Sequence, residues 1–287
     1  MNRLWVFAAA LLFSTGGAAI KGNTLTGWQV ASFRSLIAAI ALALLFPAAR
    51  RHWTWRHLLV GIAYAGTLIL FVTANKLTTS ANAIFLQSTA PGYLILFSPL
   101  LLKEHLRRTD LWLLLGVGLG MALFFTASEP ARATAPDPAT GNIVALLSGI
   151  AWAFTIIGLR WLGRAGNDPD AGLATVVLGN LLAFALALPA ALPMPGLEWR
   201  DLAVLSYLGI FQIGLAYYCL TRAIRHIPAF EAATLLLIEP ALNPVWTWLM
   251  LGERPALLSV AGGAVILGST LANTWWMSTR DRPSGAA

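Results

Sequence analysis

The chain has 287 residues, of which 58% are hydrophobic and 11% charged, and its mean hydropathy is +0.72. Soluble domains average roughly 45–50% apolar and about 25% charged residues, so this composition excludes a soluble protein and predicts an all-α integral membrane protein. The net charge of +7 does not indicate nucleic-acid binding here, because the basic residues gather at the ends of apolar segments.

Apolar runs of about 20 residues, each long enough to cross a bilayer as a helix, recur along the chain. The first is expected to be a retained helix and not a cleaved signal peptide, since Gly16 to Ile20 lead to a lysine without a clear cleavage site. Connections between the runs are short and leave no room for a soluble domain. The sequence predicts ten spans, at residues 4–20, 28–46, 58–74, 81–102, 111–126, 143–162, 171–192, 202–221, 230–251 and 256–277.

One stretch of the chain occurs twice. ANAIFLQSTAPGYLILFSPLLLKE at residues 81–104 aligns without a gap with FEAATLLLIEPALNPVWTWLMLGE at 230–253, which places Pro91 on Pro240. A proline inside a helix removes a backbone hydrogen bond and frees the carbonyl four residues earlier, here that of Gln87 and of Leu236. In a bilayer such a carbonyl needs a partner or a polar cavity, so paired broken helices predict a substrate site.

The duplication predicts two five-helix repeats. Residues 1–126 form the first, 127–141 an external linker with three prolines, and 142–287 the second. An odd number of spans per repeat makes the second enter the membrane from the opposite side, which gives an inverted repeat around a central cavity and allows alternating access. Most basic residues, including Arg50, Arg107 and Arg222, fall on the side of the N-terminus, so both termini are predicted to be cytoplasmic.

The candidate cavity wall consists of polar or aromatic side chains within spans, together with the two prolines. For the aromatic residues, close packing is the alternative reading, and for the amides it is hydrogen bonding between helices. The GxxxG at Gly116 to Gly120 is assigned to packing alone. The candidate cavity residues are Phe13, Tyr64, Gln87, Pro91, Trp152, Phe211, Gln212, Tyr218, Glu239, Pro240 and Asn243.

Two charges lie inside predicted spans. Glu239 is near the middle of its span and directly precedes Pro240. Burial favours the neutral form of a carboxyl group, so Glu239 is a candidate for proton coupling or for binding a substrate ammonium; hydrogen bonding to a freed carbonyl is the alternative. Arg34 lies within the predicted span at 28–46, and inserting a charge that deep in a bilayer costs roughly 2.5–3.5 kcal/mol. It either has a structural partner or contacts the substrate.

A family resemblance rests on the pattern A-x(7)-P-x(12)-E in both copies, on the basic ends of the first helix of each repeat, and on Arg34. The chain resembles the EamA type of the drug/metabolite transporter superfamily, and within it the bacterial exporters of aromatic and other amino acids. This resemblance implies ten helices, a central cavity and export of small metabolites. The chain departs from a strict duplication at one point: the second repeat has Asn180 or a neighbour at the position that corresponds to Arg34 in the first. The residues that carry the resemblance are Lys21, Arg34, Ala83, Pro91, Glu104, Arg160, Ala232, Pro240 and Glu253.

Enzyme, cofactor and metal motifs are not expected from this sequence. Cys219 is the single cysteine, no HExxH motif occurs, and no P-loop indicates ATP hydrolysis. The predicted function is a monomeric secondary exporter of small metabolites, with aromatic or neutral amino acids as substrates, in a bacterial inner membrane. Its partners would be the substrate and membrane lipid, without nucleic acid. The alternatives are a multidrug or cation exporter, and a lipid scramblase or membrane-embedded enzyme.

Overall fold

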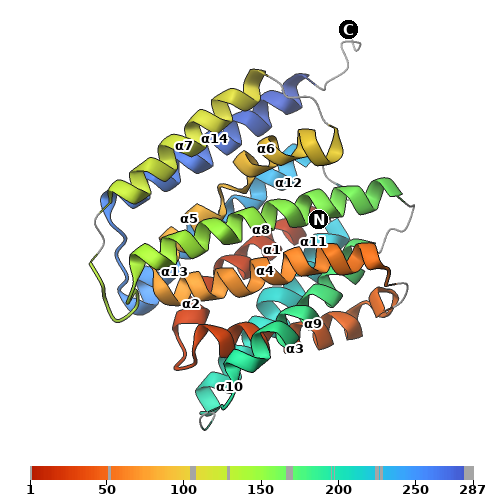
Figure 1. The fold of residues 1–287 in the computed structure, drawn as a ribbon, viewed down its shortest axis with the longest axis vertical. Helices are drawn as coiled ribbons and strands as arrows, with labels where there is room; N and C mark the ends of the chain where they lie inside the picture. Colours follow the sequence, from red (N-terminus) through yellow and green to blue (C-terminus); the bar gives the residue numbers. More distant parts are fainter. Residues whose placement is uncertain are drawn as a thin grey trace.

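The computed structural model describes residues 2–50, 53–103, 108–127, 130–165, 171–194, 196, 198–223, 226 and 229–280. These residues form helices and no strand, apart from an isolated bridge between Arg132 and Ala135 (Figure 1). The class predicted from composition, an all-α membrane protein, is therefore confirmed.

The helices follow one another with short connections. In chain order they are α1 (Asn2–Ser14), α2 (Gly16–Lys21), α3 (Gly27–Leu45), η1 (Pro47–Arg50), α4 (Trp55–Leu77), α5 (Ser80–Gln87), α6 (Ala90–Leu102), α7 (Arg108–Thr126), α8 (Pro138–Ala165), α9 (Ala171–Ala191), α10 (Trp199–Ser206), η2 (Tyr207–Leu215), α11 (Ala216–Ala223), α12 (Ala229–Leu236), α13 (Ile238–Leu251) and α14 (Leu257–Arg280).

Nine helical segments of the described residues are long and apolar enough to cross a membrane. The predicted span at 111–126 falls on α7, whose apolar part, Asp110–Thr126, is shorter than these nine. The count of ten spans therefore remains a prediction.

Large apolar side chains cover the outside of the helices. Leu100, Trp112 and Leu257 are 77%, 75% and 83% exposed. Soluble monomers rarely expose apolar surface on this scale, so lipid is the solvent that this surface fits. Trp55 and Trp199, at helix ends, are also exposed, as expected of interfacial anchors.

Helices from the two halves of the chain pack against each other in opposite directions. Gln29 Nε2 of α3 donates to the Ala191 carbonyl oxygen of α9 at 3.2 Å, and Ser32 Oγ donates to the Phe184 carbonyl oxygen at 3.0 Å. Residue numbers rise along α3 as they fall along α9, so the two helices are antiparallel.

The same holds for α7 and α14, which lie side by side in Figure 1. A methyl group on Gly116 would meet Ser269, and one on Gly120 would lie 2.8 Å from the Gly262 carbonyl oxygen. The order is again reversed. Both glycines of the GxxxG thus allow close approach to α14, which is the packing role predicted for them.

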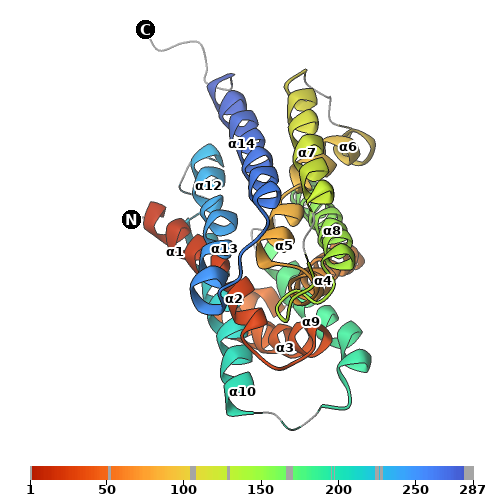
Figure 2. The same cartoon turned by 90° about the vertical axis from the view of Figure 1, so that its left-hand side faces the viewer.

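Both predicted helix breaks are present. α5 ends at Gln87 and α6 begins at Ala90, directly before Pro91. In the second copy, α12 ends at Leu236 and α13 begins at Ile238. Figure 2 shows α5 between α1, α12 and α13 on one side and α6, α7 and α8 on the other. The first break, which follows α5, therefore lies in the interior of the bundle, where a freed carbonyl is protected from lipid.

Backbone groups freed at the first break have identifiable neighbours. Thr89 Oγ1 donates to the Leu86 carbonyl oxygen at 2.6 Å. The carbonyl oxygens of Leu86 and Gln87 also lie close to Gly149 of α8, where an added Cβ would be 3.1 Å from each. A glycine at this position allows α8 to approach the break.

Candidate functional site

A cavity of about 510 Å³ lies in the middle of the bundle, between helices from both halves of the chain. Its wall is mostly apolar, with a few polar and charged side chains. Of the candidate cavity residues predicted from the sequence, those that line it are Phe13, Tyr64, Gln87, Pro91, Trp152, Gln212, Glu239 and Pro240. The two proline breaks thus lie on the same cavity.

Three predicted residues lie elsewhere. Phe211 is 45% exposed and stacks on Tyr207, with ring centroids 5.9 Å apart. The Arg222 guanidinium lies over the ring of Tyr218, 5.6 Å from its centroid. Asn243 is buried against Gly17, outside the cavity wall. Their prediction as cavity residues is corrected accordingly.

The stretch of η2 and α11 presents other residues to the cavity than those predicted. The residues of this stretch that line the cavity are Gln212, Ile213, Tyr217 and Leu220. The adjacent pair Tyr217 and Tyr218 gave no indication in the sequence of which ring points inward.

The aromatic rings of the cavity form a connected row. Phe13 meets Tyr217 edge-on at 5.4 Å, Tyr217 meets Tyr64 edge-on at 6.4 Å, and Tyr64 meets Trp152 at 6.5 Å. These separations are typical of favourable aromatic pairs. Phe13 and Trp152 are therefore separated by two tyrosines from opposite halves of the chain.

Gln87 has a structural contact as well as a place in the wall. Its Nε2 donates to Ser148 Oγ of α8 at 2.8 Å, and Ser148 Oγ donates to the Thr67 carbonyl oxygen of α4 at 3.2 Å. Gln212, in contrast, makes one long contact of 3.5 Å from Nε2 to the Phe13 carbonyl oxygen, and its Oε1 is buried without a partner. Of the two amides, Gln212 is therefore the one with more hydrogen-bonding capacity left for a ligand.

Both intramembrane charges line the cavity. Arg34 is 2% exposed, and its Nη2 donates to the Leu68 carbonyl oxygen at 3.4 Å. Its Nε is buried without a hydrogen-bond partner. Glu239 forms no hydrogen bond or ion pair with any residue that the structure describes, so the alternative in which it bonds a freed carbonyl is not seen.

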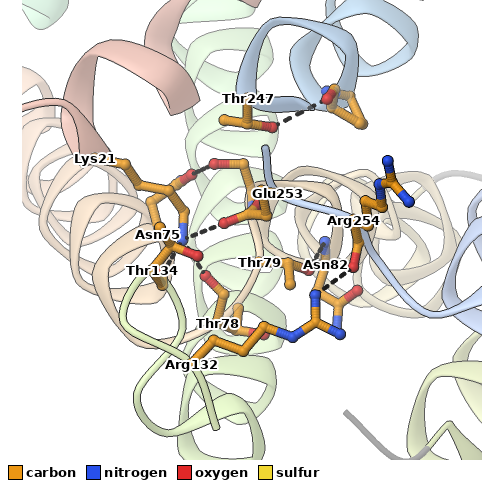
Figure 3. Close-up of polar contacts among 12 residues, drawn as sticks. Lys21, Asn75, Thr78, Thr79, Asn82, Arg132, Thr134, Thr247, Glu253 and Arg254 are labelled. Carbon is orange, nitrogen blue, oxygen red and sulfur yellow. Dashed lines mark hydrogen bonds and ion pairs between the residues drawn. The ribbon is translucent and has the colours of Figure 1, made fainter. Parts of the chain in front are cut away.

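One end of the bundle is held by a buried ion pair (Figure 3). Lys21 Nζ, at the end of α2, lies 2.8 Å from Glu253 Oε2, and the two side chains are 2% and 1% exposed. Lys21 also donates to the carbonyl oxygens of Thr78, at 2.7 Å, and of Thr134. The Ser80 amide at the start of α5 donates to Glu253 Oε1 at 2.6 Å. The pair therefore joins α2, α5, the loop after α13 and the 127–141 segment.

Further contacts extend this network, as Figure 3 shows in part. Asn142 Oδ1 of α8 accepts from Thr78 Oγ1 at 2.8 Å and from Asn82 Nδ2 at 3.0 Å. Arg132 Nη1 donates to the Arg254 carbonyl oxygen at 2.9 Å. The pairing of Lys21 with Glu253 could not be predicted, because one sequence does not report which span ends meet.

Glu231, at the other end of the bundle, pairs with Arg3, with Arg3 Nη2 3.3 Å from Glu231 Oε2. This pair is far more exposed than that of Lys21 and Glu253. Glu104, the counterpart of Glu253 in the first copy, lies outside the described residues.

Known proteins resemble the chain along most of its length. Residues 3–126 and 139–275 both match the model of the EamA-like transporter family. The pseudopaline exporter CntI of Pseudomonas aeruginosa strain PAO1 is 28% identical over 279 residues, which is 92% of each chain. The threonine/homoserine exporter RhtA of Escherichia coli K12 is 29% identical over 222 residues, covering 75% of this chain and 70% of that protein. A solved crystal structure has a TM-score of 0.64 at 20% identity and 98% coverage of both chains, which shows a shared fold.

Proposed function

Because the chain belongs to the EamA-like transporter family, we propose that it is a secondary exporter of small metabolites, with aromatic or neutral amino acids as its substrates. As a bacterial multi-pass inner-membrane protein it would work by alternating access between its two halves.

The observation that carries this proposal is the shared cavity. It lies in the bundle interior, receives both proline breaks, and contains few polar groups within an apolar wall. Small-molecule sites usually occupy about 300–1,000 Å³ and have this mixture of side chains. The volume of about 510 Å³ suits a substrate of amino-acid size.

Antiparallel packing supports an inverted repeat. α3 corresponds to α9 in the repeat, as α7 does to α14, and each pair packs antiparallel. Counterpart helices that run in opposite directions are what two inverted five-helix repeats require. In this arrangement both termini face the cytoplasm, and the Lys21–Glu253 pair closes the periplasmic end of the cavity.

Two relatives support the substrate class. Their names describe exporters of threonine and homoserine and of pseudopaline. In this chain the row from Phe13 to Trp152 offers aromatic and apolar surface for a side chain. Glu239, which forms no hydrogen bond or ion pair with the described residues, is the proposed proton-coupling group.

Glu239 also favours a second candidate. A carboxylate in an apolar, aromatic cavity attracts hydrophobic cations, so a multidrug-type cation exporter is the alternative.

Counterflow in liposomes tests the proposal. Purified protein is reconstituted into liposomes loaded with unlabelled phenylalanine, and saturable uptake of labelled phenylalanine is expected. Uptake of tetraphenylphosphonium without phenylalanine counterflow would favour the cation exporter. Scrambling of a fluorescent lipid without solute flux would contradict both.

A further inference from the structure

Arg34 has an unusual environment for a buried cation. Its side chain lines the cavity and is 2% exposed, yet no carboxylate of the described residues pairs with it. The one hydrogen bond found for it is a 3.4 Å contact to the Leu68 carbonyl oxygen. Arginine has five N–H donors, so most of its donor capacity is unused and Nε is buried without a partner.

An unpaired guanidinium at this depth is costly, and such charges in membrane proteins generally have a partner or a function. Glu239 lines the same cavity but forms no ion pair with Arg34. Tyr64 interacts electrostatically with Arg34, and Tyr217 with Glu239. The hydroxyl oxygens of these two tyrosines lie 3.1 Å apart. Both tyrosines line the same cavity as the two charges, and neither charge forms an ion pair with any residue that the structure describes.

We propose that Arg34 binds the carboxylate of the transported metabolite. This assignment rests on the proposed function, because it takes the central cavity as the substrate site. A planar guanidinium can bind a carboxylate through two parallel hydrogen bonds, and in a cavity of low polarity such bonds are strong. A carboxylate is therefore the group that most directly completes the hydrogen bonding of Arg34.

The described residues of the second half place no cation in the cavity wall. Asn180 of α9, which stands at or near the position that corresponds to Arg34, is fully buried, and its Nδ2 donates to the Val176 carbonyl oxygen of its own helix at 2.9 Å. Arg34 is therefore the one cation among the described residues that line the cavity, which fixes one orientation for a substrate with a single carboxylate.

The consequence is a selectivity rule. A substrate amide offers the guanidinium a neutral oxygen in place of a carboxylate, so the ion pair and its second hydrogen bond are lost, and a hydrogen bond to a charged group is worth about 1.5–3 kcal/mol. Phenylalaninamide keeps the ring and the amine of phenylalanine and replaces the carboxylate with a neutral amide. Phenylpropionate keeps the carboxylate and lacks the ammonium. The three compounds separate the contribution of the carboxylate from that of the ammonium.

The test is ligand-dependent thermal stabilisation of the purified full chain, alongside counterflow in liposomes. The wild type is expected to bind phenylalanine about tenfold or more tightly than phenylalaninamide. Arg34→Gln should lose this preference and bind phenylalaninamide as the wild type does. Arg34→Lys, which keeps the charge but not the planar fork, should retain part of it. Arg222→Gln, which removes a cation outside the cavity, is the matched control and should behave as the wild type.

Equal binding of phenylalanine and phenylalaninamide to the wild type would overturn the assignment, as would an Arg34→Gln variant that keeps the wild-type preference. Carboxylate-selective binding without counterflow would instead contradict the proposed function and support the role of Arg34. Counterflow without carboxylate selectivity would support the function and remove Arg34 from substrate recognition.

Discussion

Tyr64 and Tyr217, which come from opposite halves of the chain, lie with their hydroxyl oxygens 3.1 Å apart and their rings edge-on. This contact joins α4 to α11 in the wall of the cavity. Any movement of one half against the other must alter it, so it connects the packing of the bundle to the proposed transport cycle.

Tyr217 and its neighbour Tyr218 provide a test of which of the two rings lines the cavity. Tyr217→Ala removes a ring that packs on Phe13 and Tyr64, and counterflow of phenylalanine should fall about tenfold or more because the aromatic wall is interrupted. Tyr218→Ala is the matched control and should leave counterflow near the wild-type rate. The opposite ranking would contradict the cavity wall described above.

The buried Lys21–Glu253 pair should be far more sensitive than the exposed Arg3–Glu231 pair. Removing one partner of a buried pair leaves an uncompensated charge, so Lys21→Met should lower the free energy of unfolding by about 3–5 kcal/mol. Lys21→Met combined with Glu253→Gln should recover much of this loss. Arg3→Gln should cost about 1 kcal/mol or less. Thermal unfolding in detergent would be measured for the wild type and the three variants. Equal losses of stability for Lys21→Met and Arg3→Gln would contradict a stabilising role of the buried Lys21–Glu253 pair.

Close packing of α7 on α14 predicts different effects at two neighbouring glycines. The methyl group of Gly120→Ala would lie 2.5 Å from Ile266 Cγ1 and 2.8 Å from the Gly262 carbonyl oxygen, so the helices must separate, at a cost of about 1–3 kcal/mol. Gly118 has no atom within 4 Å of an added Cβ. Gly118→Ala should therefore leave the melting temperature unchanged or raise it slightly. A similar drop for both variants would argue against this helix pairing.

Glu239 is expected to be needed for coupling to protons and not for exchange of substrate. Glu239→Gln keeps the size of the side chain but cannot release a proton. Counterflow, which needs no net proton movement, should persist, while accumulation of phenylalanine driven by a pH gradient should be lost. Gradient-driven accumulation by Glu239→Gln at the wild-type rate would remove Glu239 from the coupling mechanism.

Much of the fold follows from local rules that one sequence contains. The breaks before Pro91 and Pro240 follow from the missing amide of proline, and the role of Gly116 and Gly120 follows from their spacing.

Other features depend on contacts that local rules do not contain. Ile213 and Tyr217 line the cavity and Phe211 and Tyr218 do not, and the sequence alone does not distinguish these close neighbours. Asn243 is buried beside Gly17 and away from the cavity, and neither polar atom of its side chain has a hydrogen-bond partner among the described residues. The pairing of Lys21 with Glu253 joins residues more than 200 positions apart in the sequence.

Access to the cavity from the two membrane faces tests the central claim most directly. Cys219 is the single cysteine, and Ser88 lines the cavity at the first helix break. In the variant carrying Cys219→Ser and Ser88→Cys, a membrane-impermeant maleimide is applied to right-side-out and to inverted vesicles, with and without phenylalanine. Alternating access predicts labelling from both faces and protection by phenylalanine on each. Labelling from one face only, unchanged by phenylalanine, would contradict a shared cavity that opens to each side in turn.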